Sequence, residues 1–281
     1  MILDGKSIAK EREKELAEEI KKLPRAPGLS FILVGDNPAS KKYIGVKKRA
    51  CARLGINSFD YELEEDVSLE EVKNLVLKLN ADPLVDGILL QLPLPAHLPA
   101  YSILSLIDPR KDVDGFHPWN MGSLLIGETP YFFPCTPKGI YHLLHHYHIP
   151  LQGKKVTIVG RSAIVGKPLA AMMLRKKEDS NATVTITHQY TSNLQEHTLS
   201  ADIIVAALGK PHLIKSSMLK KGVVVIDVGI SLYQGKLEGD VDPKALEQKA
   251  SYYTPVPGGV GPMTVLSLME NCLLAYKNRM E

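Results

Sequence analysis

The chain has 281 residues, a length that corresponds to about two domains, and 44% of its residues are hydrophobic and 23% charged. That composition excludes a disordered, collagen-like or coiled-coil chain, and the length is sufficient for a substantial hydrophobic core. The 34 lysines and arginines nearly balance the 31 acidic residues, which leaves a formal net charge of +3. A nucleic-acid-binding surface needs a larger or more clustered excess, so we expect no nucleic-acid partner.

Neither a secretory signal nor a membrane helix is expected. Residues 1–23 are rich in charge and lack the apolar core of a signal peptide. The longest apolar runs fall well short of the roughly 20 residues that a membrane helix needs. The three cysteines, Cys51, Cys135 and Cys272, are widely spaced and predict neither a disulfide framework nor a Cys-x-x-Cys metal site. A reducing cytoplasm suits such a chain best.

The first half of the chain predicts alternating helices and strands. Short apolar runs indicate strands at 29–35, 56–63 and 85–91. Helical patterns cover 7–23, 40–54, 68–79 and 97–107. Gly55 is a stop signal for the second helix, and Ser68 with Glu71 forms a capping box at the third. This β-α-β-α order predicts a parallel sheet.

Residues 108–138 break this rhythm, because they are rich in proline and glycine and show no periodicity. A structureless segment of that length is usually functional or a linker, so we predict the interdomain hinge here.

The second half predicts a nucleotide-binding β-α-β series. Strands are expected at 154–160, 182–188, 201–208 and 222–229, with a short helix between each later pair. A helix at 137–147 is expected before the first of these strands. A second helix is expected after the loop that follows this strand, and it ends at about Lys177. The last helix, at 262–278, follows a loop at 254–264.

The segment Gly160–Gly166 follows a predicted strand and opens a predicted helix. Glycines let the backbone approach a phosphate, and the helix N-terminus supplies unpaired N–H groups. The spacing is not Gly-x-Gly-x-x-Gly, so an ordinary turn of a doubly wound sheet is the alternative. The next strand ends in 187–190 without the acid that binds the ribose of NAD, and Arg161 stands in the loop. Since guanidinium pairs with phosphate, we expect NADP rather than NAD.

Tyr43 and Lys47 are four residues apart on one predicted helix and therefore share a face. One interpretation is a solvated cationic face with a half-buried tyrosine. The other is a lysine that exchanges protons beside a stacking or hydrogen-bonding tyrosine. Short-chain dehydrogenases also use Tyr-x-x-x-Lys, but they place it after the glycine loop, whereas here it comes first.

We expect no metal site. A run of histidines between residues 141 and 148 has helical spacing, but no acid or cysteine completes a ligand set. Asp108, Asp112 and Asp114 lack the spacing of a calcium loop.

Seven motifs occur in the order of one known family and cover nearly the whole chain. They are PASKKYIGVKKRACARLGI (38–56), DGILLQLPLP (86–95), KDVDGFHPWNMGSL (111–124), PCTPKG (134–139), GRSAIVGKP (160–168), DVGI (227–230) and TPVPGGVGPMT (254–264). With them the chain resembles the bifunctional methylenetetrahydrofolate dehydrogenase/cyclohydrolases, the FolD family. Several motifs in order are far more specific than any single one.

The resemblance implies two α/β domains with a cleft between them. The N-terminal catalytic domain would comprise 1–136 and 263–281, and a Rossmann-like NADP-binding domain 137–262. The implied function is NADP-dependent oxidation of 5,10-methylenetetrahydrofolate to the methenyl form and its hydrolysis to 10-formyltetrahydrofolate. That reaction supplies one-carbon units to purine, methionine and histidine synthesis. A homodimer is implied too, and a polyglutamate tail on folate is the expected partner of the basic helix.

The resemblance also assigns the site residues. Lys47 would serve hydration, Gln91 would position its amine, Tyr43 would stack on folate, and Asp114 would pair with the amino edge of the pterin. Further folate contacts would come from Leu90, Leu92, Pro257, Gly258, Gly259 and Pro262. The cofactor would contact Gly160, Arg161, Ser162, Val165, Gly166, Gln189 and Ile230.

The chain departs from the family pattern at one point of the cofactor site. The usual Cys-His-Ser reads Thr187-His188-Gln189, and residues 175–181 are longer than usual. Two other classes are weighed against the family: an amino-acid or shikimate-type dehydrogenase, and a nucleotide-binding regulatory module without catalysis. The set of Tyr43, Lys47, Gln91 and Asp114 argues against the first, and the intact Lys47 and Gln91 argue against the second.

Overall fold

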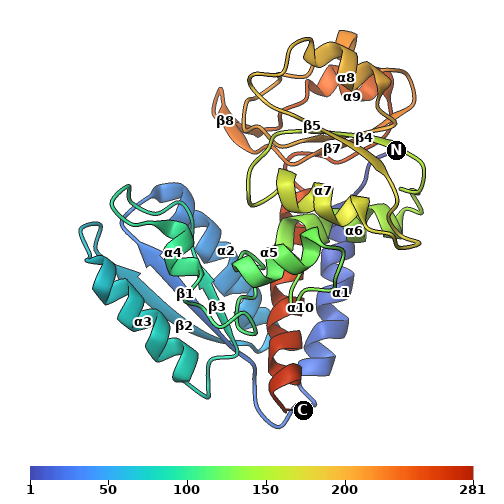
Figure 1. Cartoon of the computed structure of the whole chain (residues 1–281). Coiled ribbons are helices and arrows are strands. Elements are labelled where there is room, and N and C mark those ends of the chain that lie inside the picture. Colours follow the sequence, from blue (N-terminus) through green and yellow to red (C-terminus); the bar gives the residue numbers. More distant parts are fainter. Residues whose placement is uncertain (281) are drawn as a thin grey trace. The chain divides into compact units, whose positions relative to one another are not determined.

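The computed structural model describes residues 1–280, and the chain forms two compact units (Figure 1). Unit 1 comprises Met1–Ala9, Leu124–Glu128 and Thr136–Thr264. Unit 2 comprises Lys10–Ser123, Thr129–Cys135 and the chain from Val265 onward. Helices α1 (Gly5–Ile20) and α10 (Val260–Met280) each contribute residues to both units.

Unit 2 is built on a three-stranded parallel sheet. Its strands β1 (Gly28–Val34), β2 (Asn57–Leu63) and β3 (Gly87–Leu90) have the order β2-β1-β3. The helices that follow or connect them are α2 (Pro38–Leu54), α3 (Leu69–Ala81), α4 (Ala100–Leu104) and α5 (Pro118–Leu125). The parallel sheet and the β-α-β-α order are therefore confirmed.

Local signals place the ends of these helices. Asn37 caps α2, because its side chain accepts hydrogen bonds from the N–H groups of Ala39 and Ser40. Gly55 ends the same helix in a left-handed conformation with φ of 78°. Both halves of the predicted capping box at Ser68 and Glu71 are present at the start of α3.

The core of unit 2 lies between its sheet and α3. Ile32 of β1 and Ile88 of β3 are buried in one cluster with Val72, Val76 and Leu79 of α3. These three α3 residues follow the spacing of one helix face, and burying each such side chain contributes roughly 1.5–3 kcal/mol.

The prediction of an unstructured segment at 108–138 is wrong in part. Pro118–Leu125 forms α5, and α6 (Cys135–His146) begins inside the segment. Residues beside β3 also pair with it, since the N–H of Ile88 donates to Lys111 O over 2.7 Å and Ile88 forms a parallel bridge with Asp112. These short elements depend on tertiary hydrogen bonds, which leave no periodic signal. The predicted helix 97–107 is only Ala100–Leu104. Pro99 stands at its N-cap, and after Leu104 the chain continues in turns, in which the N–H of Ile107 donates to Leu104 O.

Unit 1 contains a five-stranded parallel sheet. Strands β4 (Lys155–Val159), β5 (Thr183–Thr187), β6 (Ile203–Ala206), β7 (Val223–Asp227) and β10 (Ala250–Tyr253) have the order β10-β7-β6-β4-β5. In Figure 1, α8 (Leu194–Ser200) and α9 (Pro243–Lys249) cover one face of this sheet, and α7 (Gly166–Leu174) with α6 covers the other. Unit 1 is thus a doubly wound fold, whose order of strands reverses between β4 and β6.

Several details of unit 1 differ from expectation. β10 and the antiparallel hairpin of β8 (Ser231–Tyr233) and β9 (Lys236–Glu238) were not expected. The helix expected between β6 and β7 is only the 3-10 turn Ser216–Met218, and α7 ends at Leu174. The strands β8, β9 and β10 lack the buried apolar run by which the equally short β3 and β6 were predicted.

The ends of the chain are tied down in the unit to which each belongs. The N–H of Leu3 donates to Tyr253 O over 2.8 Å, and Tyr253 N–H donates to Met1 O over 3.0 Å, so the chain start covers the edge of β10. In unit 2, Asn271 of α10 donates to the carbonyl of Val113 over 2.8 Å. α10 begins two residues before the predicted 262, and Pro262 lies in its first turn as expected. Within residues 1–280 no helix is long and apolar enough to cross a membrane.

Replacing Ser68 by alanine tests the capping box. The substitution removes the side-chain acceptor for the N–H of Glu71, so we expect the free energy of unfolding to fall by about 1 kcal/mol. Denaturant titration measures it. Glu71→Gln keeps both reciprocal bonds and should cost much less; equal losses in the two variants would contradict the role of the Ser68 hydroxyl.

Candidate active site

A lysine and a glutamine meet at the carboxyl end of β3. Lys47 Nζ, on α2, donates a hydrogen bond to Gln91 Oε1 over 3.1 Å. Gln91 is only 9% exposed, its Nε2 donates to Leu92 O over 2.6 Å, and its backbone N–H donates to Ile32 O. Because Nε2 is held by a carbonyl, the amide oxygen must face Lys47. One of the three donors of the lysine ammonium is therefore positioned by a fixed partner.

Tyr43 lies one turn before Lys47 on the same face of α2. Its side chain is 47% exposed, so the ring is available for stacking on a ligand. Leu90 is buried and Leu92 is half-buried on either side of Gln91. The structure thus brings the predicted Lys47 and Gln91 into contact, with Tyr43 beside them on α2.

Asp114 belongs to the segment that runs beside β3, and two buried charges hold that segment. The first is Lys111, whose Nζ donates to the carbonyl oxygens of Leu79, Asn80 and Asp82 over 2.8–3.0 Å. It therefore binds the orphan carbonyls at the C-terminal end of α3. Burial, and then the charge of Arg279, lowers the pKa of Lys111 to about 8.

The second buried charge is Asp112, which is 1% exposed. Its Oδ2 accepts hydrogen bonds from His117 N–H over 2.7 Å and from Asn120 Nδ2 over 2.8 Å, which ties the segment to the start of α5. Burial raises the pKa of Asp112 to about 7. Sequence analysis placed Lys111 and Asp112 in a family motif but missed their roles, because no local pattern marks their hydrogen-bond partners. Asp114 follows them and is half-buried.

The glycine loop of unit 1 is sterically restricted to glycine at both ends. A Cβ on Gly160, whose φ is +131°, would lie 2.3 Å from Ala207 O. A Cβ on Gly166 would lie 2.1 Å from Gly160 O. The loop therefore packs against its own backbone and against the residue that follows β6. β4 and β6 are the two strands between which the order reverses, and ligands of doubly wound sheets bind at that point, outside the carboxyl ends.

The other predicted cofactor residues lie at the same edge of the sheet. Arg161 is exposed, and its guanidinium carbon is 5.8 Å from the centroid of the Tyr190 ring, next to Gln189 at the end of β5. Ile230 follows β7. Ser162 Oγ accepts from the N–H of Val165 over 3.1 Å and so closes the loop at the start of α7. An edge with an anion-accepting loop and an exposed arginine fits a dinucleotide phosphate.

The proline-glycine segment before α10 also belongs to unit 1. The N–H of Gly259 donates to Pro255 O over 2.9 Å, and Lys6 N–H donates to Gly258 O over 2.9 Å. Pro257 lies within this turn, and Pro262 follows it in α10. The backbone of the turn is thus held both within itself and by the start of the chain.

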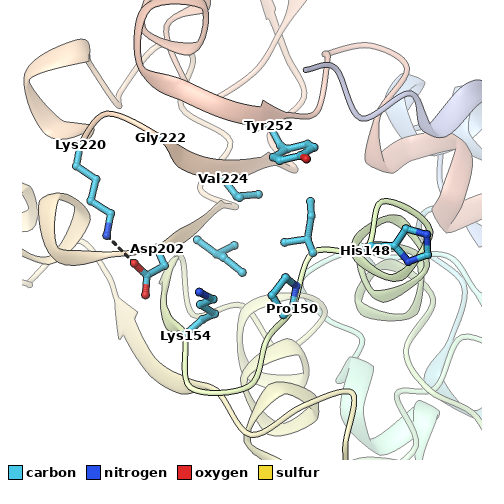
Figure 2. A pocket seen from close by; sticks show the side chains of 10 residues that line it. His148, Pro150, Lys154, Asp202, Lys220, Gly222, Val224 and Tyr252 are labelled. Carbon is cyan, nitrogen blue, oxygen red and sulfur yellow. Dashed lines mark hydrogen bonds and ion pairs between the residues drawn. The ribbon is translucent and has the colours of Figure 1, made fainter.

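A cavity of about 310 Å³ in unit 1 lies away from these residues (Figure 2). It opens at the amino ends of the strands, where Lys154, Asp202 and Lys220 line it, and Lys220 Nζ donates to Asp202 over 2.6 Å. Parallel sheets bind ligands at the opposite, carboxyl edge, so this cavity is not the expected cofactor site. The described part of the chain holds no group of three or more metal-ligating side chains.

A doubly wound unit with a glycine loop, joined to a second α/β unit with a lysine–glutamine pair, defines the class of two-domain NAD(P)-binding enzymes. Residues 3–114 match the description "Tetrahydrofolate dehydrogenase/cyclohydrolase, catalytic domain", and residues 134–280 match its "NAD(P)-binding domain". The chain belongs to the tetrahydrofolate dehydrogenase/cyclohydrolase family.

Individual relatives agree over the full length. A bifunctional protein FolD of Hydrogenobaculum sp. is 52% identical, with 99% of each chain covered. The crystal structure of a FolD enzyme from Campylobacter jejuni is 46% identical, with a TM-score of 0.95 and 99% of each chain covered. That of Trypanosoma brucei, complexed with NADP cofactor and inhibitor, is 36% identical, with a TM-score of 0.94 and coverage of 100% and 98%. The resemblance inferred from the motifs is confirmed, and the alternative of an amino-acid or shikimate-type dehydrogenase is not favoured.

The raised pKa of Asp112 predicts a pH-dependent stability. An aspartate whose pKa rises from 3.8 to about 7 on folding stabilises the folded state at low pH and loses that contribution as the pH rises through this window. Asp112→Asn keeps an oxygen acceptor for both donors and cannot ionise. We expect its unfolding free energy, measured by denaturant titration from pH 4 to 7, to fall less steeply than that of the wild type.

The exposed Asp66→Asn is the matched control and should leave the slope nearly unchanged. Identical pH slopes for Asp112→Asn and the wild type would contradict this account of Asp112.

Proposed function

We propose that this chain oxidises 5,10-methylenetetrahydrofolate with NADP to the 5,10-methenyl form and hydrolyses that product to 10-formyltetrahydrofolate. The observation that carries the proposal is the hydrogen bond between Lys47 and Gln91, in a chain whose whole length matches this family. The pair supplies a positioned amine for the hydration, which is the step that needs proton transfer.

Folate binding falls to unit 2 and to the turn before α10. We assign stacking on the ring system to Tyr43, whose ring is half-exposed, and a hydrogen bond to the amino edge of the pterin to Asp114. A carboxylate accepts two such N–H donors well, and its segment is held by Lys111 and Asp112. Further contacts are proposed for Leu90, Leu92, Pro257, Gly258, Gly259 and Pro262.

The oxidation asks mainly for alignment. A hydride leaves a carbon that is flanked by two nitrogens, so the cation that remains is delocalised and needs little acid–base assistance. Bound NADP supplies the hydride acceptor. The residues of the chain then have to hold the methylene carbon in contact with the nicotinamide and to exclude water until transfer is complete.

The hydration asks for proton transfer. Water adds to the methenyl carbon and gives up both of its protons as the formyl C=O forms. The bond from this carbon to one ring nitrogen breaks, and that nitrogen takes up one of the two protons. The overall step consumes one water and releases one proton. We assign the movement of these protons to Lys47 Nζ, with Gln91 Oε1 fixing its direction.

Cofactor binding falls to the carboxyl edge of the sheet of unit 1. We assign the diphosphate to the loop of Gly160, Ser162, Val165 and Gly166, and the 2′-phosphate to Arg161. Gln189 stands where the family usually has serine and can donate to the same phosphate through its amide. Ile230 follows β7, which β6 separates from β4 and its glycine loop. The NADP complex of the Trypanosoma brucei relative supports NADP as the cofactor.

Four further assignments complete the proposal. The functional domains are residues 1–136 with 263–281 for folate and 137–262 for NADP, although Met1–Ala9 cluster with unit 1. The enzyme acts in the cytoplasm, which agrees with three buried cysteines that form no disulfide. It acts as a homodimer. Its product supplies purine, methionine and histidine synthesis.

Replacing Lys47 by methionine tests the proposed mechanism. The variant keeps the length of the side chain and removes the amine, so we expect hydrolysis of methenyltetrahydrofolate to fall by about a hundredfold or more. The NADP dissociation constant should change little. Stopped-flow absorbance of the methenyl form and calorimetry measure the two quantities.

Lys48→Met is the control, because Lys48 lies on the same helix and pairs with Asp60 instead of Gln91. Normal hydrolysis in Lys47→Met, or an equal loss in the control, would refute the role of Lys47.

The basic helix α2 predicts a preference for polyglutamylated folate. Within the described residues, Lys42 and Arg49 have no carboxylate partner, whereas Lys48 pairs with Asp60. Reversing both charges, in Lys42→Glu with Arg49→Glu, should raise KM for a triglutamate substrate about fivefold and leave KM for the monoglutamate unchanged. The double reversal Lys73→Glu with Lys78→Glu on α3 changes the net charge equally and should affect neither; a similar rise there would show a general charge effect.

A further inference from the structure

Two buried aspartates of unit 1 lie outside the catalytic set. Asp227, the last residue of β7, is 2% exposed, and Asp240, which follows the β8–β9 hairpin, is fully buried. Neither forms an ion pair with a lysine, arginine or histidine within residues 1–280. A buried carboxylate without a cationic partner needs several hydrogen bonds, and both have them.

Asp240 accepts three backbone hydrogen bonds from the loop that follows β6. Its Oδ2 accepts from the N–H of Leu208 over 2.6 Å and of Gly209 over 3.1 Å, and its Oδ1 accepts from Lys210 N–H over 2.7 Å. Three successive N–H groups converge on one carboxylate, as in the anion-binding concavities formed by turns. The shape of this loop therefore depends on the Asp240 side chain.

Asp227 joins the two ends of residues 228–241, the segment that contains the β8–β9 hairpin. Its Oδ1 accepts from the N–H of Gly229 over 3.1 Å and of Asp240 over 3.0 Å, and its Oδ2 accepts from Val241 N–H over 2.9 Å. Gly229 lies at the beginning of this segment, and Asp240 and Val241 lie at its end. Asp227 thus holds Asp240 in place and fixes Gly229, the residue before Ile230.

Both carboxylates are wedged against glycine. A Cβ on Gly229 would lie 2.2 Å from Asp240 Oδ1, and a Cβ on Gly239 would lie 2.1 Å from Asp227 Oδ2. The carboxylates occupy the space that any other side chain would need at these two positions. The arrangement has a single geometry and little freedom to relax.

These contacts connect the loop after β6 with the loop after β7. Both strands lie on the same side of the point between β4 and β6 where the strand order reverses. The loop held by Asp240 continues directly from Ala207, whose carbonyl packs against Gly160. Arg161 and Gln189, which we assign to the 2′-phosphate, lie on the β4–β5 side. With the 2′-phosphate at Arg161, the adenosine half of NADP would lie over β4 and β5, and its nicotinamide half over the ends of β6 and β7.

We propose that Asp240, supported by Asp227, is a positioning residue for the nicotinamide half of the cofactor. It shapes the loops after β6 and β7, so that hydride transfer depends on it and hydrolysis of preformed methenyltetrahydrofolate does not. This inference rests on the proposed function.

Asp240→Asn tests the proposal in the full-length protein. An amide keeps one oxygen acceptor and turns an NH2 group toward backbone N–H donors, so at least one of the three hydrogen bonds is lost. We expect the NADP dissociation constant, from calorimetry, to rise about tenfold and the KM for NADP to rise with it. Hydrolysis of methenyltetrahydrofolate in the absence of cofactor should stay within about twofold of the wild type.

Lys210→Pro is the second variant, because it removes one of the three donors and leaves both carboxylates intact. It should weaken NADP binding about threefold and spare hydrolysis, and it decides the question if Asp240→Asn does not fold. Unchanged NADP affinity in a folded variant overturns the proposal, and so does a parallel loss of affinity and hydrolysis, which is the sign of general destabilisation. A wild type that binds NADP but converts no folate would refute the proposed function instead, and the calorimetry would still test Asp240.

Discussion

Parallel strand pairing is the constraint on which the rest of this molecule depends. Every pair of neighbouring strands in the two larger sheets runs parallel, so all carboxyl ends of a sheet lie at one edge. Residues that are far apart in the chain are gathered there by the loops that follow the strands. Gln91 follows β3, while Gly160, Gln189 and Ile230 follow β4, β5 and β7. Parallel pairing also requires crossover helices, and one of them, α2, brings Lys47 to Gln91.

Buried ionisable groups hold the loops that these edges carry. Lys111 binds three carbonyl groups at the end of α3, Asp112 binds the start of α5, and Asp240 binds three N–H groups after β6. Burial raises the pKa of Asp112 and of Asp227 to about 7 in each case, which is the energetic cost of placing a carboxylate there. The hydrogen bonds of these buried groups hold each loop in one geometry. A site for hydride or proton transfer tolerates little positional error.

Much of this could be predicted from the sequence, because the signals are local. The caps at Ser68 and Gly55, the strand–glycine–helix order at Gly160 and the shared face of Tyr43 and Lys47 each lie within a few residues of chain. Family motifs added Gln91, whose contact with Lys47 the structure shows, while the role of Asp114 stays a prediction. The sequence could not predict α5, the β8–β9 hairpin or the roles of Lys111 and Asp240. Lys111 binds carbonyls some 30 residues earlier, and Asp240 binds N–H groups some 30 residues earlier, so no local pattern marks either contact.

One assay tests the central claim, that this chain is an NADP-dependent folate dehydrogenase with cyclohydrolase activity. The purified protein is mixed with methylenetetrahydrofolate and either NADP or NAD, while the absorbance of the reduced cofactor and of the methenyl form is recorded together. The account predicts reduction of NADP, faster than that of NAD at equal concentration, and a methenyl signal that decays faster than in buffer alone. No reduction of either cofactor, in protein shown to be folded, would contradict it.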